Sequence, residues 1–313
     1  LIGTIAALCG ICQSIFGFSK AEKIWFNTIS FTSLFIKGVA RPFSIFQSPA
    51  AFADYGILSI IGIIILLYTE KNILKYLMIV LFPVLVYSIL ITSVRSSWIG
   101  VVIVFALWII IFMLKNSKYR LLAIVVFSVL FAVLHSVDLY LDDSLKNGAF
   151  VAFLGSKLNP QYLDLMVTNR MGGIANPFAE HSLMSRFALW RYLIILCADP
   201  VMALLGRGVG ALNSDSLYFT YLAEFGFPGM IFIILLYFYY IKKGFSLFKK
   251  TENQDETAII KGITIMNIAF AVMNLTGTHI HSFPGDAFFW FWNGVLIRIA
   301  TTREKQNETT DNP

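Results

Sequence analysis

Long apolar runs separated by short polar connections occupy most of the chain, and one long polar stretch follows the fifth run. A helix that crosses a bilayer needs about 20 mostly apolar residues. The runs that approach this length are Leu1–Phe18, Phe52–Tyr68, Tyr76–Thr92, Trp98–Leu114, Leu121–Val137, Leu217–Ile241, Ala258–Thr276 and Ala287–Ala300. The pattern predicts an all-α polytopic membrane protein with about eight transmembrane helices and one large, partly helical outer loop.

Basic residues in the connections predict the orientation of these spans. They gather in alternate connections and near the C-terminal end, at Lys71, Lys75, Lys115, Lys118, Arg120, Lys242, Lys243, Lys249, Lys250, Arg298, Arg303 and Lys305. Strict alternation of eight spans puts all of them on one side. Short cytoplasmic loops carry an excess of Lys and Arg, so this side is predicted to be the cytoplasm.

The predicted organisation has four parts. Residues 1–137 hold the first five transmembrane helices with an outer segment at 19–51, and residues 138–216 form a large extracytoplasmic loop. Residues 217–300 hold the remaining three helices, and 301–313 form a cytoplasmic polar tail. Because Leu1 already lies inside an apolar run, we expect the chain to be a fragment or a processed product, with earlier spans missing.

The composition supports a membrane protein and argues against other classes. Hydrophobic residues make up 58% of the chain and charged residues 13%, and the mean hydropathy is +0.75. A net charge of +6 would suit nucleic acid, but the charges lie largely between the apolar runs, so we expect contacts with membrane lipids and none with nucleic acid. The three cysteines do not suggest a disulfide framework.

Two local features predict structure within and after the outer loop. Residues 182–198 are apolar with arginines at 186 and 191, which suits a helix lying in the membrane interface and ending at Asp199-Pro200. The segment Gly226-Phe227-Pro228-Gly229 interrupts the next apolar run. It predicts a half-inserted helix over Leu217–Phe225 and a true span that starts near Pro228.

Four segments, taken in order, resemble the O-antigen polymerase and O-antigen ligase superfamily of bacterial envelope glycan assembly. They are Arg41-Pro42-Phe43-Ser44-Ile45-Phe46, then Thr92-Ser93-Val94-Arg95-Ser96-Ser97-Trp98, then Arg186-x-x-x-Trp190 with Pro200 and glycines 206, 208 and 210, and last Asp215-Ser216 followed after nine residues by Gly226-Phe227-Pro228-Gly229. Ligases of this group place a histidine where this chain has Asp215. This departure favours a polymerase over a ligase.

The resemblance implies a polymerase of undecaprenyl-pyrophosphate-linked oligosaccharide repeat units, acting in O-antigen, capsule or exopolysaccharide biosynthesis. Such a glycosyltransferase works in the bacterial inner membrane with its active site on the extracytoplasmic face, and needs neither cofactor nor metal. A chain-length regulator and a flippase are compatible protein partners. The alternatives are an O-antigen ligase that transfers the glycan to a lipid or protein, and a multi-span transporter or flippase, which should show charges near the bilayer midplane.

Arginines on the outer side are the candidates for holding the leaving pyrophosphate. A guanidinium group stays charged and makes bidentate contacts with phosphate. We predict that Arg95 and Arg186 hold the pyrophosphate, although an interfacial or surface role would also explain each of them. The further candidates for substrate binding are Arg41, Arg191, Arg207, Trp190 and Glu224.

Asp215 is the candidate base for the acceptor hydroxyl, and the alternative is a helix N-cap, because Ser216-Leu217 follows it. Glu224 either shares the acceptor pocket or points to water, and an interfacial helix favours water. His279-x-His281 is half of a metal site with no third ligand at a typical spacing, so no metal site is predicted. Gly206–Gly210 is predicted to be a flexible turn whose backbone amides approach phosphate.

Overall fold

The computed structural model describes residues 2–28, 34–36, 39–69, 74–113, 181–210, 214–281 and 283–310. The predicted span Leu121–Val137 and residues 138–180 of the predicted outer loop lie outside this part. The chain forms two compact units. Unit 1 comprises Leu1–Ser59, Val80–Trp98 and Phe105–Ser185, and unit 2 comprises Ile60–Ile79, Ile99–Val104 and Arg186–Pro313. Several helices contribute residues to both units.

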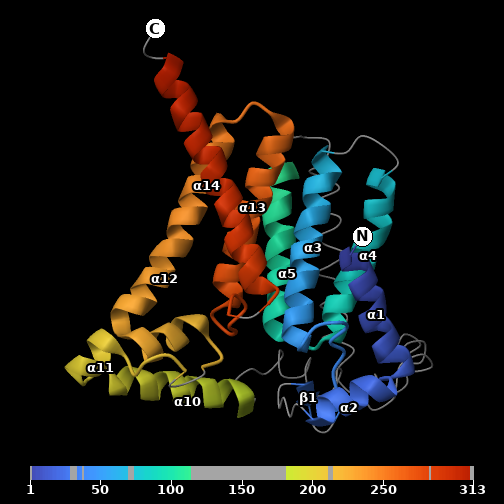
Figure 1. The fold of residues 1–313 in the computed structure, drawn as a ribbon, viewed down its shortest axis with the longest axis vertical. Helices are drawn as coiled ribbons and strands as arrows, with labels where there is room; N and C mark the ends of the chain where they lie inside the picture. The colour runs from blue at the N-terminus through green and yellow to red at the C-terminus, as the bar shows by residue number, and fades with distance from the viewer. Residues whose placement is uncertain are drawn as a thin grey trace. The chain divides into compact units, whose positions relative to one another are not determined.

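The N-terminal part of the chain is built mainly from long apolar helices, with one short polar helix among them (Figure 1). They are α1 (Ile2–Phe16), α2 (Lys20–Thr28), α3 (Pro49–Thr69), α4 (Leu74–Ile91) and α5 (Arg95–Trp108), which a π-helical turn, η2 (Ile109–Met113), extends. Strands β1 (Phe35–Ile36) and β2 (Val39–Ala40) pair antiparallel, with Phe35 opposite Ala40. Apart from these two short strands, the regular elements described in this part of the chain are helices.

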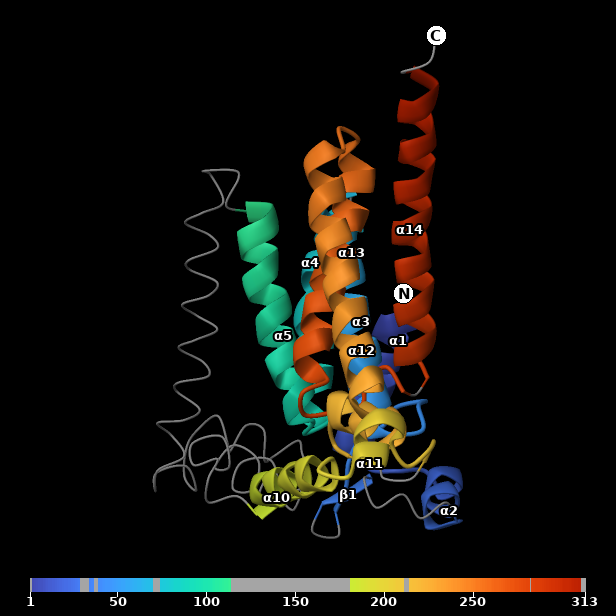
Figure 2. The same ribbon diagram turned by 90° about the vertical axis from the view of Figure 1, so that its left-hand side faces the viewer.

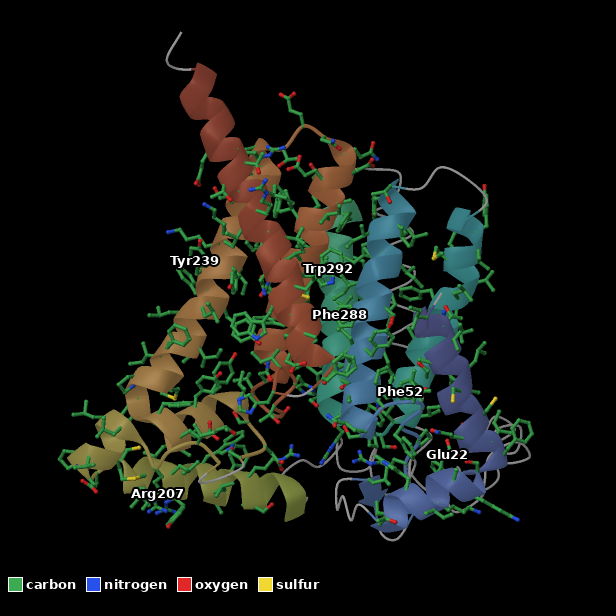
Figure 3. All side chains as sticks on the ribbon, viewed as in Figure 1. Glu22, Phe52, Arg207, Tyr239, Phe288 and Trp292 are labelled. Carbon is green, nitrogen blue, oxygen red and sulfur yellow. The ribbon has the colours of Figure 1, made fainter. Side chains whose placement is uncertain are left out.

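A glutamine on α1 holds the outer segment of unit 1 in place. Gln13 is buried; its Oε1 accepts hydrogen bonds from the backbone N–H groups of Phe43 and Ser44 at 3.0 and 2.7 Å. Its Nε2 donates to the Ser44 carbonyl and to Glu22 of α2. Burial alone would raise the pKa of Glu22, but hydrogen bonds from Ser19 and Gln13 outweigh it and lower that pKa. Glu22, which Figure 3 labels, is therefore charged at neutral pH.

Unit 2 holds most of α10 (His181–Leu196) and all of α11 (Pro200–Leu205), α12 (Leu217–Lys250), α13 (Gln254–Met273) and α14 (Gly285–Thr310). Helices α10 and α11 lie across the N-terminal end of α12 (Figure 1). The predicted helix over 182–198 is confirmed within a few residues. The predicted break is also confirmed, because Gly226 has φ 69° and ψ −166° and divides α12.

Buried amides join the long helices of unit 2. Asn267 on α13 and Asn293 on α14 are fully buried, and each side chain donates to the other, at 2.8 and 3.2 Å. Each Nδ2 also donates to a carbonyl one turn earlier in its own helix, so these groups remain satisfied. Interhelical hydrogen bonds of this kind contribute about 1 kcal/mol inside a membrane protein. The pair therefore fixes the register of α13 against α14.

One side of α12 is apolar and exposed. Phe232, Leu235, Phe238 and Tyr239 are each at least 49% exposed. Figure 3 shows Tyr239 on the side of α12 that faces away from α13 and α14. Large exposed apolar surfaces are unfavourable in water and expected against lipid, so this side suits contact with acyl chains.

Among the described residues, four helices are long and apolar enough to cross a membrane: Pro49–Thr69, Arg95–Phe112, Leu217–Lys250 and Gln254–Met273. Ile2–Phe16 and Tyr76–Ile91 are apolar but shorter. The structure therefore supports an all-α membrane protein, and it does not show the eight spans predicted from the sequence. The first run falls short because α1 ends at Phe16, before Gly17 with φ 79°.

The polar segment near the C-terminal end is helical. Residues 301–310 were expected to be part of a polar tail, but α14 continues through Thr310 and extends past the ends of α12 and α13 (Figure 2). Ion pairs anchor this extension: Arg303 pairs with Glu256 of α13 at 2.7 Å, and Glu304 pairs with Lys243 of α12 at 2.8 Å. These ion pairs with α12 and α13 stabilise the part of α14 that extends beyond the apolar run.

Candidate functional site

Two of the predicted site residues form an ion pair in unit 2. The Nε of Arg186, on α10, donates to the carboxylate of Asp215 at 3.0 Å. The Arg186 side chain is 22% exposed and that of Asp215 66%. The N-cap of α12 is Ser216, so the interpretation of Asp215 as the cap is wrong. Instead, Asp215 lies just before the helix with its carboxylate accessible to solvent and directed to a guanidinium.

Trp190 lies next to this pair along α10 and attaches the helix to α12. Its indole stacks on Phe219 with ring centroids 4.9 Å apart and meets Phe187 edge to face. Leu193 and Leu222 are buried in the same interface. The Trp190 role predicted from sequence was substrate binding, and its ring is engaged in packing here.

Two buried polar groups belong to residues close to Arg186 and Asp215 in the chain. The indole N–H of Trp190 and the hydroxyl of Ser214 have no hydrogen-bond partner among the described residues. Such groups are costly unless a water or ligand satisfies them. Ser214 directly precedes Asp215 in the chain, and Trp190 lies one turn after Arg186 on α10. This arrangement suits an anionic, hydroxyl-bearing ligand.

Two glycines bring the segment after α11 into close contact with the kink of α12. A Cβ on Gly206 would meet the backbone of Glu224 and Phe225, and a Cβ on Gly226 would meet that of Ala203 and Leu204. Both glycines have positive φ, 67° and 69°. Only glycine adopts this conformation without strain and lets two backbones approach so closely. The glycines thus let α11 and the segment after it pack closely against the kink of α12.

Glu224 is buried, at 6% exposure, and the prediction that it points to water is wrong. Its Oε1 accepts from the Gly210 N–H at 2.8 Å. Its backbone carbonyl accepts from Gly208, and the Ala223 carbonyl accepts from Arg207. These bonds occupy the amides of 207, 208 and 210, so the predicted phosphate contact through them is also wrong. The Gly210 N–H supplies the buried carboxylate with a donor in place of water.

A substitution at Gly206 tests the close contact. Gly206→Ala is expected to lower the stability by about 1–3 kcal/mol more than Gly208→Ala, because it adds overpacking to the cost of positive φ. Gly208 is the matched control, since its φ is 90° and nothing lies within 4 Å of an added Cβ. Thermal unfolding of the purified protein in detergent measures the difference. Equal losses in the two variants would contradict a close-contact role for Gly206.

Two further predicted arginines of unit 2 are exposed. Arg191 lies on α10 and Arg207 follows α11, where Figure 3 shows it beside α10. Neither has an ion pair within the part of the chain that the structure describes. Their guanidinium groups are accessible to phosphate, but the structure does not bring them into the Arg186–Asp215 pair.

An asparagine that the sequence analysis missed anchors the start of α12. The Asn274 carbonyl accepts from the Leu217 N–H at 3.0 Å and from the Ser216 hydroxyl at 3.2 Å. Its Oδ1 accepts from the His279 N–H, and its Nδ2 donates to the Tyr237 hydroxyl. A polar residue in the last turn of a predicted span, shortly before Thr276-Gly277, is the only sequence signal for this role.

The buried His279 contributes to this anchor. A Cβ added at Gly277 would meet its ring, so the imidazole would have to shift to admit a larger residue there. In the described ranges, no group of three or more His, Cys, Asp or Glu residues has a geometry that could hold a metal ion. The His279-x-His281 pair is therefore part of the turn between α13 and α14.

Unit 1 contains the other two predicted arginines, around the turn that precedes α5. Arg41 is buried, and its Nη1 donates to the Thr92 carbonyl at 3.4 Å. Arg95 is the first residue of α5, and the N-cap Val94 gives the helix no side-chain cap. The hydroxyls of Ser93 and Ser97 and the indole N–H of Trp98 are buried without a hydrogen-bond partner in the described segments. A helix N-terminus with cations and free donors favours anions.

Comparisons with family models, curated proteins and solved structures found no match to this chain.

Proposed function

We propose that the protein is a polymerase of lipid-pyrophosphate-linked oligosaccharide repeat units, a metal-independent glycosyltransferase of the bacterial inner membrane. The observation that carries the proposal is the Arg186–Asp215 pair, in which the Asp215 carboxylate is accessible and the neighbouring residue in the chain, Ser214, has a buried hydroxyl with no partner among the described residues. The pair lies at the end of α12 opposite Lys249 and Lys250, so it lies on the extracytoplasmic side if the lysines are cytoplasmic.

Arg186 is suited to the leaving pyrophosphate. An exposed ion pair contributes about 0–1 kcal/mol, so a pyrophosphate with several charges competes well with Asp215 for the guanidinium. A cation placed where negative charge develops lowers the barrier to departure of the lipid pyrophosphate. In the absence of donor, Asp215 holds the guanidinium of Arg186 in a defined position.

Asp215 is suited to the acceptor. Its side chain is 66% exposed, so a sugar hydroxyl can reach the carboxylate from solvent. A carboxylate within hydrogen-bond distance of that hydroxyl can accept its proton as the oxygen attacks the anomeric carbon. The bond from the anomeric carbon to the pyrophosphate oxygen breaks as the new glycosidic bond forms. The donor itself supplies the leaving group, so no nucleotide sugar is needed.

The other elements of the proposal rest on the sequence and on unit 1. Arg95 contributes a second cation for phosphate, at the N-terminus of α5 beside the unpartnered Ser93 and Ser97 hydroxyls. Eight spans are proposed, with α1, α4 and α14 crossing the bilayer together with the four long apolar helices and the run Leu121–Val137.

Deletion of the gene, with the surface glycan resolved on a gel, tests this function. We expect glycan capped with a single repeat unit, and restoration of the polymer ladder by the wild-type chain. Accumulation of lipid-linked polymer without transfer would indicate a ligase instead. Single lipid-linked units that remain at the cytoplasmic face would indicate a flippase. A normal polymer ladder in the deletion strain would contradict the proposal.

A further inference from the structure

A cavity lies at the end of unit 2 opposite the Arg186–Asp215 pair. It has a volume of about 330 Å³ and is bounded by α12, the turn before α13, and α14. Three basic residues line it, Lys243, Lys250 and Arg303, together with Glu252 and Glu304. The glycosyl-transfer chemistry proposed above uses none of these residues.

The cavity lies at the level where the helices change from apolar to charged. On α14, the buried Ala300 lines the cavity and is followed within one turn by Arg303. On α12, the buried Leu247 is followed by Lys249 and Lys250 at the end of the helix. In a bilayer, this change of character coincides with the phospholipid headgroups. A ligand of the cavity would therefore be exposed to headgroups on its membrane side.

The charges that line the cavity differ in how firmly they are held. Arg303 is fixed by two bonds to the Glu256 carboxylate, at 2.7 and 3.2 Å, and by one to the Lys250 carbonyl at 3.1 Å. Lys243 pairs with Glu304, whose side chain is 61% exposed. An exposed pair is weak, so another anion can replace Glu304. The ammonium of Lys250 has no ion pair among the described residues.

We propose that this cavity binds the phosphate of an anionic phospholipid headgroup, with Lys243 and Lys250 as the ligands. Lys243 and Lys250 of α12 both line this cavity, whereas Lys242 and Lys249 do not. Basic pockets between transmembrane helices bind such headgroups. This site is independent of the proposed polymerase activity.

The test uses the full chain in nanodiscs of phosphatidylcholine with phosphatidylglycerol added, and native mass spectrometry of the retained lipid. The wild type is expected to retain phosphatidylglycerol in preference to phosphatidylcholine. The variant Lys243→Gln/Lys250→Gln is expected to bind it about 30-fold more weakly, from the usual contribution of two basic residues at a membrane surface. Thermal unfolding in detergent checks that each variant is folded.

Two further variants keep the result interpretable. Lys242→Gln/Lys249→Gln removes the same charge from the same end of α12, yet neither residue lines the cavity, so wild-type retention is expected. Glu304→Gln removes the carboxylate that competes for Lys243, so tighter binding is expected. If the two double-lysine variants lost phosphatidylglycerol binding equally, general surface charge would explain the effect. That result would overturn the proposal.

Inorganic phosphate distinguishes a lipid from a soluble anion. At millimolar concentration it is expected to leave the phosphatidylglycerol adduct unchanged, because the lipid is concentrated at the membrane surface. Displacement of the lipid by inorganic phosphate would make a soluble anion the ligand and overturn the lipid assignment. Equal retention of phosphatidylcholine and phosphatidylglycerol by the wild type would also overturn it.

Discussion

Arg186→Ala is expected to lower polymer formation about 10²–10³-fold at normal protein level, the usual cost of removing one group that stabilises developing charge. The Arg186 side chain is 22% exposed and pairs with Asp215 at 3.0 Å. An ion pair of this kind contributes little to stability, so we expect the substitution to reduce the rate of glycosyl transfer far more than the stability of the fold. Arg186→Lys is expected to restore part of the activity, because an ammonium supplies charge without the bidentate fork. Gel analysis of glycan length in the complemented deletion strain compares the wild type with Arg186→Ala and Arg186→Lys.

Arg298→Ala is the matched control, since it makes the same change at the opposite end of unit 2. It is expected to leave the polymer ladder unchanged. Arg95→Ala is expected to cause a loss like that of Arg186→Ala, from the prediction that it also contacts pyrophosphate. A full ladder from the Arg186→Ala chain would remove Arg186 from the proposed site.

Asp215→Asn is the second change with a large expected effect. An amide cannot accept a proton, so loss of a general base is expected to slow polymer formation about 10²–10⁴-fold. The amide oxygen still accepts a hydrogen bond from Arg186, so folding is expected to stay near wild type. Because Ser216 and not Asp215 is the N-cap of α12, a capping effect no longer competes with this explanation. Glycan gels at matched protein level, with thermal unfolding, measure both quantities.

Two companion variants sharpen the result. Asp215→His supplies a group that can accept a proton, so it is expected to retain more activity than Asp215→Asn. The exchange Arg186→Asp/Asp215→Arg rebuilds an ion pair with its ends reversed, so it is expected to keep stability without restoring the ladder. A wild-type ladder from the Asp215→Asn chain would leave Asp215 with only its role as the partner of Arg186.

The sequence alone determined the elements with local signals. Apolar runs near the length of a bilayer predicted the long helices, and the pattern over 182–198 predicted α10. Gly226 and Pro228 predicted the division of α12, because a glycine at positive φ and a proline act on the backbone next to them. The arginines and Asp215 were also found from sequence, since charged residues are rare in an apolar chain.

Only the tertiary structure decided how these residues are partnered. Asp215 lies 29 positions from Arg186, and no local pattern predicts their ion pair. Glu224 was predicted to point to water because its helix was expected to lie flat in the interface, but its side chain is buried and accepts from the Gly210 amide. Hydrogen bonds and burial of this kind depend on packing between segments that are distant in the sequence. In contrast, the spacing of apolar residues and the positions of glycine and proline determine the backbone conformation within a few residues.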